Sequence, residues 1–144
     1  MVQTRLSHVL IVDPDAETRL LYRTALASLG AIISEAEDGA EALGKAICAP
    51  PAVIVTETRL PRLDGLALCS SLRRNPTTAH IQIVVASGAA SASARIEAYA
   101  AGADAVFVKP YPIHELVAAV RQMCRDRDGD PVAASTASRR SPST

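Results

Sequence analysis

The sequence predicts one doubly wound α/β domain, in which a five-stranded parallel sheet carries helices on both faces. Two observations support this prediction. Five short apolar runs lack the alternation of a half-exposed strand, and such runs are typical of parallel strands buried on both faces. A segment whose apolar residues recur at helical spacing follows each run, and strict alternation of strands and helices favours a parallel sheet.

The length and composition fit a single globular domain. The chain has 144 residues, of which 49% are hydrophobic and 21% charged, and its 15 basic residues balance its 15 acidic residues. This balance, together with an aromatic content of 3%, gives no support to nucleic-acid binding. No apolar run approaches the roughly 18 residues of a membrane span. We therefore expect a soluble, cytoplasmic protein with no nucleic-acid or membrane partner.

The first strand and helix have clear boundaries in the sequence. The apolar run His8–Asp13 ends at Pro14, which has no N–H group to donate to a sheet. Asp15 is a suitable N-cap for a helix over Ala16–Leu29, and Gly30 is a suitable end. The expected apolar face of this helix consists of Leu20, Leu21, Ala25, Leu26 and Leu29.

Four similar units follow. The remaining strands are predicted at Ala31–Glu35, Ala52–Thr56, Ile81–Ala86 and Asp104–Val108. The remaining helices are predicted at Ala40–Cys48, from Asp64 to about Arg74, at Ser91–Ala101 and at Ile113–Arg125. The fourth helix is rich in alanine but weakly apolar, so we expect it to pack loosely. This domain, residues 1–125, should precede a disordered tail, residues 126–144, whose polar composition cannot bury enough apolar area to offset the entropy of ordering.

Polar side chains gather where the predicted strands end. Ligands of such sheets bind beyond the carboxyl ends of the strands. That rule selects Asp13–Asp15, Glu57–Arg59, Ser87–Gly88 and Lys109–Pro110. Clustered carboxylates suggest a hard cation such as Mg²⁺, and a serine and a lysine suggest recognition of a phosphoryl group. The alternative is that the carboxylates are solvated strand-end residues, neutralised by the nearby lysine and arginine.

Five short motifs resemble the receiver domain of bacterial two-component response regulators. They are Val9–Asp13, Glu37–Leu43, Leu60–Gly65, Ala101–Asp104 and Lys109–Pro110. The resemblance extends over about residues 7–125 and implies a flavodoxin-like sheet with the strand order 2-1-3-4-5. It also implies a non-enzymatic signalling module, whose partner is a histidine kinase, another signalling protein or a separate output protein. Homodimers would form through the fourth helix, the fifth strand and the fifth helix.

The resemblance assigns roles to the strand-end residues. The aspartate that accepts a phosphoryl group in the family corresponds to Glu57, and its hydroxyl and lysine positions are matched by Ser87 and Lys109. Glutamate is one methylene longer than aspartate, and a misplacement of about 1 Å can cost about 10²-fold in rate. The turn after the acceptor strand supplies Arg59, Pro61, Asp64 and Gly65.

Two further positions depart from the family pattern. The second metal-binding acid falls on Pro14, with Asp15 displaced by one residue toward an expected role as N-cap. The ligands that remain are Asp13, Glu57 and the Arg59 carbonyl, so we expect no cofactor, and weak Mg²⁺ binding at best. The aromatic switch position falls on Val106.

For the four arginines between residues 59 and 74, the sequence supports less specific predictions. The Arg59 side chain is expected to point to solvent, with a fold-back over the carboxylates as the alternative. Arg62, Arg73 and Arg74 form a modest basic cluster that we expect on a solvated face.

These departures lead to one main hypothesis. A receiver-like fold with Glu57 at the acceptor position would act by protein–protein interaction, independently of aspartyl phosphorylation. The alternative is a working phospho-switch with an altered metal site or a hydroxyl acceptor, at Thr56, Thr58 or Ser87. A flavin-nucleotide binder is disfavoured, because no phosphate-binding loop follows Asp13 and the chain has no Trp.

Overall fold

A parallel sheet of five strands forms the centre of the molecule. The computed structural model describes residues 7–88 and 91–127. The strands lie in the order β2-β1-β3-β4-β5, and every neighbouring pair is parallel. Their bounds are β1 His8–Val12, β2 Ile32–Ala36, β3 Val53–Thr56, β4 Gln82–Ser87 and β5 Ala105–Val108. The predicted flavodoxin-like fold class and strand order are confirmed.

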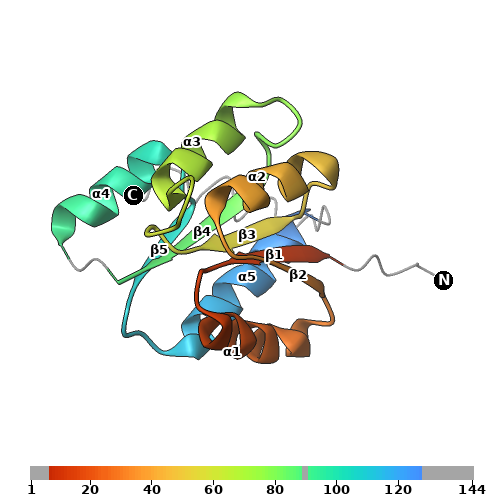
Figure 1. Cartoon of the computed structure of the whole chain (residues 1–144). Coiled ribbons are helices and arrows are strands. Elements are labelled where there is room, and N and C mark those ends of the chain that lie inside the picture. Colours follow the sequence, from red (N-terminus) through yellow and green to blue (C-terminus); the bar gives the residue numbers. More distant parts are fainter. Residues whose placement is uncertain (1–6, 89–90, 128–144) are drawn as a thin grey trace.

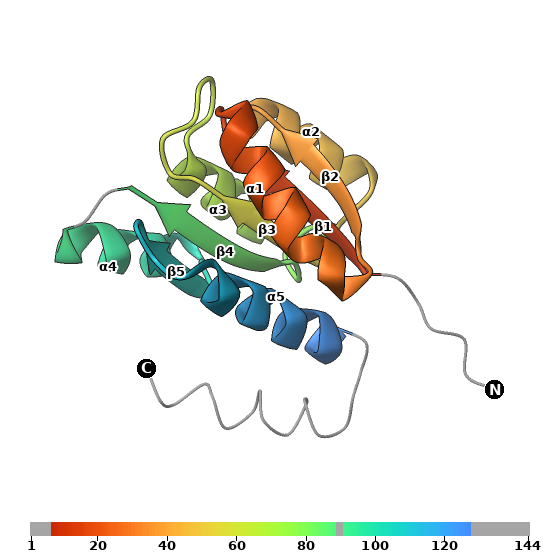
Figure 2. The same cartoon turned by 90° about the horizontal axis from the view of Figure 1, so that it is seen from below.

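Five α-helices cover the two faces of this sheet. Their bounds are α1 Ala16–Leu26, α2 Gly39–Cys48, α3 Gly65–Arg74, α4 Ala92–Ala101 and α5 Ile113–Arg127. Helices α2, α3 and α4 lie on one face (Figure 1), whereas α1 and α5 lie together on the other (Figure 2). A 3₁₀ turn, Ala27–Leu29, completes the first predicted helix. No helix in the described part of the chain combines the length and the apolarity that crossing a bilayer requires.

The core has two layers because successive side chains of a strand point to opposite faces. In β1, Val9 and Ile11 belong to the core layer that also contains buried residues of α1 and α5, whereas Leu10 and Val12 belong to the layer that contains buried residues of α2, α3 and α4. All four side chains are buried, as predicted for a strand covered on both faces. Ala98 is the one buried residue of α4, in keeping with the loose packing predicted for that helix.

The predicted apolar face of α1 is partly wrong. Leu20 and Leu21 are 61% and 54% exposed, whereas Tyr22 and Leu26 are buried against the sheet. Residues four apart share a face of a helix, so the burial of Leu26 turns Tyr22 inward and its two predecessors outward. The predicted α5 face is confirmed, since Leu116, Val120 and Met123 are buried and Val117 packs beside them. Helix α5 continues to Arg127, and residues 128–144 of the predicted tail lie outside the described residues.

Side-chain caps begin four of the helices. The side chains that accept a hydrogen bond from a backbone N–H of the first turn are Asp15, Asp38, Asp64 and Ser91. Such caps satisfy donors that have no partner within the helix. Gly30 ends the first helix with φ of +70°, in the left-handed region that favours glycine.

The register of the sheet gathers the carboxyl ends of the strands at one edge. Val12 of β1 pairs with Thr56 of β3, so the residues that follow them, Asp13 and Glu57, are neighbours. The amide of Glu57 donates to the carbonyl of Val12 at 3.1 Å. On the other side, Lys109 follows β5, and its amide donates to the carbonyl of Ser87 at 2.9 Å. Four strands thus deliver the predicted site residues to one place.

Arg73 does not lie on a solvated face as predicted. Its guanidinium donates to the carbonyls of Ala79 and Gly102, at 2.8 and 2.7 Å, and to the carboxylate of Asp104 at 2.8 Å. It also donates to the carbonyl of Ile81. One side chain of α3 therefore joins the segment before β4 to the segment between α4 and β5. The neighbouring Arg74 is exposed, as expected.

Replacing Arg73 with lysine should destabilise the fold. A lysine ammonium cannot reach three carbonyls and a carboxylate at once, so Arg73→Lys should lower the free energy of unfolding by about 2–4 kcal/mol. The matched control is Arg74→Lys, which should change it by less than about 0.5 kcal/mol. Urea unfolding followed by circular dichroism measures both values. Equal effects of the two substitutions would contradict the bridging role.

Candidate functional site

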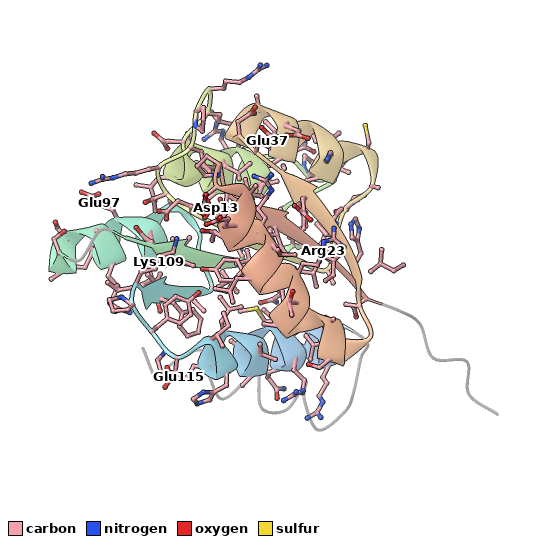
Figure 3. All side chains as sticks on the ribbon, turned by 60° about the horizontal axis from the view of Figure 1, so that its bottom comes forward. Asp13, Arg23, Glu37, Glu97, Lys109 and Glu115 are labelled. Carbon is pink, nitrogen blue, oxygen red and sulfur yellow. The ribbon has the colours of Figure 1, made fainter. Side chains whose placement is uncertain are left out.

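A lysine and two carboxylates form the centre of the site. Lys109 Nζ lies 2.9 Å from Glu57 Oε1 and 3.6 Å from Asp13 Oδ2. Figure 3 shows Asp13 and Lys109 close together near the start of α1, with the labelled Arg23 farther along that helix. The side chains of Asp13 and Glu57 are 6% and 11% exposed, so the lysine neutralises two largely buried charges.

The second oxygen of Glu57 is bound by its own turn. Oε2 accepts hydrogen bonds from the Thr58 amide at 2.7 Å and from the Thr58 hydroxyl at 3.0 Å. The Arg59 amide adds a longer contact of 3.4 Å. With Oε1 held by Lys109, both oxygens of the carboxylate have partners within the protein.

The turn after β3 is closely packed, and Gly65 allows this packing. A Cβ atom at Gly65 would lie 2.2 Å from the carbonyl oxygen of Glu57, so no larger residue fits without a shift. The Gly65 amide donates to the carbonyl of Thr58 at 2.8 Å, while Asp64 caps α3 through the amide of Ala67. Pro61 also belongs to this turn, where its carbonyl accepts from the Leu63 amide at 2.7 Å. The backbone that carries Glu57 and Thr58 is therefore fixed.

The acids that follow β1 have different environments. Asp13 is buried, and its Oδ1 accepts from the Asp15 amide at 2.9 Å. The side chain of Asp15 is turned to α1, where it accepts from the amide and the hydroxyl of Thr18 at 3.0 and 2.6 Å. Arg19 donates to the Asp13 carbonyl at 2.6 Å and so fixes this bend. Asp15 is thus the predicted N-cap.

The charges of the cluster shift the pKa of each member. Burial works to raise the pKa of Glu57, but the hydrogen bonds from Lys109 and Thr58 and the lysine charge outweigh it, and the pKa lies below its usual value. Burial dominates at Asp13 and raises the pKa of that carboxyl, despite the Asp15 amide and the lysine charge. Burial works to lower the pKa of Lys109, but the hydrogen bond and charge of Glu57 outweigh it, and the pKa is raised. Glu57 and Lys109 therefore form an ionised pair.

This arrangement does not fit Mg²⁺, which prefers near-octahedral oxygen ligands. Within residues 7–88 and 91–127, no three His, Cys, Asp or Glu side chains are grouped so as to hold a metal ion. Pro14 offers no side-chain ligand, and the Lys109 ammonium lies between the two carboxylates that remain. The Arg59 side chain is exposed and makes no ion pair in the described structure, so its alternative fold-back is not observed.

The last two predicted positions lie on β4 and β5. Ser87 is buried, and its hydroxyl lies 2.8 Å from that of Thr58. Val106 is 8% exposed and packs in the layer beneath α3 and α4, while its carbonyl accepts from Arg95 of α4 at 3.1 Å. The sequence did not indicate that Thr58 would contact both Glu57 and Ser87, because the rotamer of a turn residue is not encoded in any spacing.

Comparison with protein families gives one clear match. A family model described as the response regulator receiver domain matches residues 9–121. The matched region begins in β1, ends within α5 and includes every residue of the site.

Two relatives illustrate the similarity in sequence. The DNA-binding dual master transcriptional regulator RpaA of Synechocystis is 31% identical over 126 residues, which are 88% of this chain and 52% of RpaA. The response regulator MprA of Mycobacterium bovis is 35% identical over 131 residues, which are 91% of this chain and 56% of MprA. This chain thus spans about half the length of these relatives.

Two solved structures illustrate the similarity in fold. The receiver domain of the Francisella response regulator 1452 matches with a TM-score of 0.77 and 29% identity, over 84% of this chain and 98% of that one. The chemotaxis protein CheY4 of Vibrio cholerae matches with a TM-score of 0.75 and 26% identity, over 83% of this chain and 99% of that one. Both agree with the strand order observed here.

The ion pair of Glu57 should make stability depend on pH in acid. Because the folded-state pKa of Glu57 is depressed, its contribution is present above the ordinary value of 4.5 and is lost as pH falls through the folded-state pKa. Glu57→Gln should therefore flatten this part of the stability curve, which urea unfolding at a series of pH values measures. Glu115→Gln is the control, since that exposed residue of α5 has no ion pair in the described structure. An unchanged slope in Glu57→Gln would rule out the stabilising pair.

Proposed function

Because this chain belongs to the response regulator receiver family, we propose that it is a signal-transduction module that works without aspartyl phosphorylation. It would act through protein–protein contacts and would not be an enzyme. The observation that supports this proposal is the state of the acceptor-equivalent residue. Glu57 replaces the reactive aspartate, and both of its oxygens are bound inside the protein.

The geometry explains why Glu57 would be a poor acceptor. In-line attack needs a free oxygen at the correct distance, and the extra methylene directs Oε2 into the turn, toward the Thr58 amide. Phosphoryl transfer also relies on a metal ion that neutralises the developing charge. With Pro14 and a capping Asp15, we propose that Mg²⁺ binds weakly or not at all, through Asp13, Glu57 and the Arg59 carbonyl where it binds.

The ion pair also bears on the signalling state. A carboxylate that reaches Lys109 partly imitates the charge of an acyl phosphate, although it carries one negative charge instead of about two. Val106 has no aromatic ring whose rotation would report activation. We therefore favour an interaction module with weak or no switching over a permanently active one.

The proposed partners are proteins. A histidine kinase, another signalling protein or a separate output protein would bind this module, and nucleic acid would not. Homodimers would form through α4, β5 and α5. Ile96 and Tyr99 of α4 are 67% and 46% exposed, and such apolar side chains favour contact with a protein over solvent.

One observation favours a second candidate function, a switch with a hydroxyl acceptor. The Thr58 hydroxyl lies 3.0 Å from Glu57 Oε2, which is the distance between a nucleophile and its base. Thr56 is a weaker candidate because it is buried, and its hydroxyl donates to the Glu57 carbonyl.

Restoring two residues should restore phosphorylation. After incubation with Mg²⁺ and acetyl phosphate, the wild-type protein should show no stable gain of a phosphoryl group by intact mass. Glu57→Asp alone should gain little, whereas Glu57→Asp with Pro14→Asp should gain one group, because the double variant has both the shorter acceptor and a second acid for the metal.

The pattern of outcomes separates the two candidate functions. A stable gain in the wild-type protein that hydroxylamine removes and that disappears in Glu57→Gln would refute the proposal. A gain that hydroxylamine leaves intact and that disappears in Thr58→Val would establish the hydroxyl acceptor instead, and this gain would also fall in Glu57→Gln, because Glu57 would be the base. Hydroxylamine distinguishes these adducts as well, since it cleaves acyl phosphates and leaves phosphothreonine intact.

Mg²⁺ alone should have little effect on the wild-type protein. A ligand that binds only the folded state raises the melting temperature, so the midpoint of thermal unfolding reports on metal binding. Millimolar Mg²⁺ should leave the wild-type midpoint unchanged and raise that of Pro14→Asp. A rise in the wild-type protein that is lost in Asp13→Asn would show that the site binds the metal after all.

A further inference from the structure

The outer edge of β2 is covered by charged side chains. This strand is the first in the sheet order, so it pairs with β1 on one side and with no strand of the described chain on the other. An unpaired strand edge is a template for pairing with another chain. Ile32 favours such pairing, because it is an apolar, β-branched residue of this strand and is 53% exposed. The groups that cover the edge therefore decide whether it is open to a second copy of this chain.

Two carbonyls of β2 turn outward. The amide of Ile32 and the carbonyl of Ala36 are both hydrogen-bonded on the side of β1. The backbone groups of successive residues alternate between the two sides of a strand. Ile33 and Glu35 therefore turn their N–H and C=O groups away from the sheet, within a strand of five residues.

Each of these outward carbonyls accepts a hydrogen bond from a cationic side chain. Nη2 of Arg23, in α1, donates to the Ile33 carbonyl at 3.4 Å. Nζ of Lys45, in α2, donates to the Glu35 carbonyl. The two cations reach the edge from opposite sides, because α1 and α2 cover different faces of the sheet (Figure 1). Both positions at which an incoming strand could donate to β2 are thus occupied.

Carboxylates anchor both cations. Arg23 Nε lies 2.6 Å from Glu35 Oε2, and Lys45 Nζ lies 3.0 Å from Glu41 Oε2. The other oxygen of Glu35, Oε1, lies 2.8 Å from Arg19 Nε. An incoming strand would have to lie about 4.8 Å from β2, in the space that Arg23 and Lys45 occupy, and so it would have to displace them.

The opposite edge of the sheet has a similar arrangement. The last strand in the sheet order is β5, and the carbonyl of its Val106 accepts from Nη1 of Arg95, in α4, at 3.1 Å. A cation from a covering helix thus binds a backbone carbonyl at each edge. This repetition supports a role for such contacts in ending the sheet.

We propose that Arg23 and Lys45 close the edge of β2 and so prevent it from pairing with the same edge of a second copy of this chain. Without the two cations, two copies would join through antiparallel β2 strands, related by a twofold axis, into one continuous sheet. This inference goes beyond the proposed function, because it concerns the association of copies of the chain and does not depend on the chemistry of Glu57.

The test compares the full-length protein with its double variant Arg23→Ala, Lys45→Ala by sedimentation velocity over a series of concentrations. The double variant should form assemblies of at least about twice the wild-type mass, because pairing through β2 adds to any association through α4, β5 and α5. Hydrogen exchange followed by NMR identifies the surface involved. The outward amides of Ile33 and Glu35 should exchange at least about tenfold more slowly in the assembled double variant than in the wild-type protein.

Three further variants serve as controls. Arg59→Ala with Arg74→Ala removes the same amount of charge from two exposed side chains elsewhere, and should leave the wild-type mass unchanged. Arg23→Lys with Lys45→Arg should also keep the wild-type mass, because a cation remains at each carbonyl. Adding Ile32→Lys to the double alanine variant should restore the wild-type mass, since a charge on an edge strand opposes pairing.

An unchanged mass in a folded double variant would overturn the proposal. A larger assembly in which the amides of Ile33 and Glu35 exchange as fast as in the wild-type protein would overturn it as well, since the association would then use another surface. Circular dichroism establishes whether each variant is folded. Lys45→Ala alone keeps the ion pair between Arg23 and Glu35, and should show the same association to a smaller extent. If the double variant unfolds, an unchanged mass in Lys45→Ala overturns the proposal.

Discussion

An ammonium group between two carboxylates is the interaction on which this end of the molecule depends. The parallel sheet brings the ends of β1, β3 and β5 together, and so it places Asp13 and Glu57 side by side. Two neighbouring carboxylates that are largely removed from water would be costly if left unpaired. Lys109 offsets that cost, and it does so from a third strand. The chain thus supplies a cation of its own at this end of the sheet.

The length of the Glu57 side chain allows its two carboxylate oxygens to bind different partners. One oxygen reaches Lys109 while the other turns back to the Thr58 amide, so the carboxylate bridges β5 and its own turn. The turn can serve as this anchor because Gly65 lets it pack against the Glu57 carbonyl. A glutamate at position 57 is thus compatible with this fold, and its carboxylate is held by Lys109 and by the Thr58 amide.

The sequence predicted the fold well because its signals are local. Apolar runs, capping aspartates and helix-ending glycines each act within a few residues, and the helix and strand bounds followed from them. The errors concern long-range geometry. Helical spacing on α1 did not establish its phase, so Leu20 and Leu21 were assigned inward. Arg73 was expected in solvent, because the carbonyls that it binds become neighbours only after α4 and β5 have packed. The contact between Thr58 and Ser87 likewise depends on a rotamer.

The three departures from the receiver pattern would act on different requirements of a phosphorylation-dependent switch. In the proposed function, Glu57 would change the position of the attacking oxygen, Pro14 would remove a ligand for the metal, and Val106 would leave no aromatic ring to report activation. When several groups act as a unit, their contributions to the reaction rate are strongly non-additive, so the loss of one group removes most of what the others contribute. Once one requirement had failed, little selection would remain on the other two. The fold has no such dependence, because its buried core does not involve the reaction, so a receiver that works as proposed would keep its shape and its interaction surfaces.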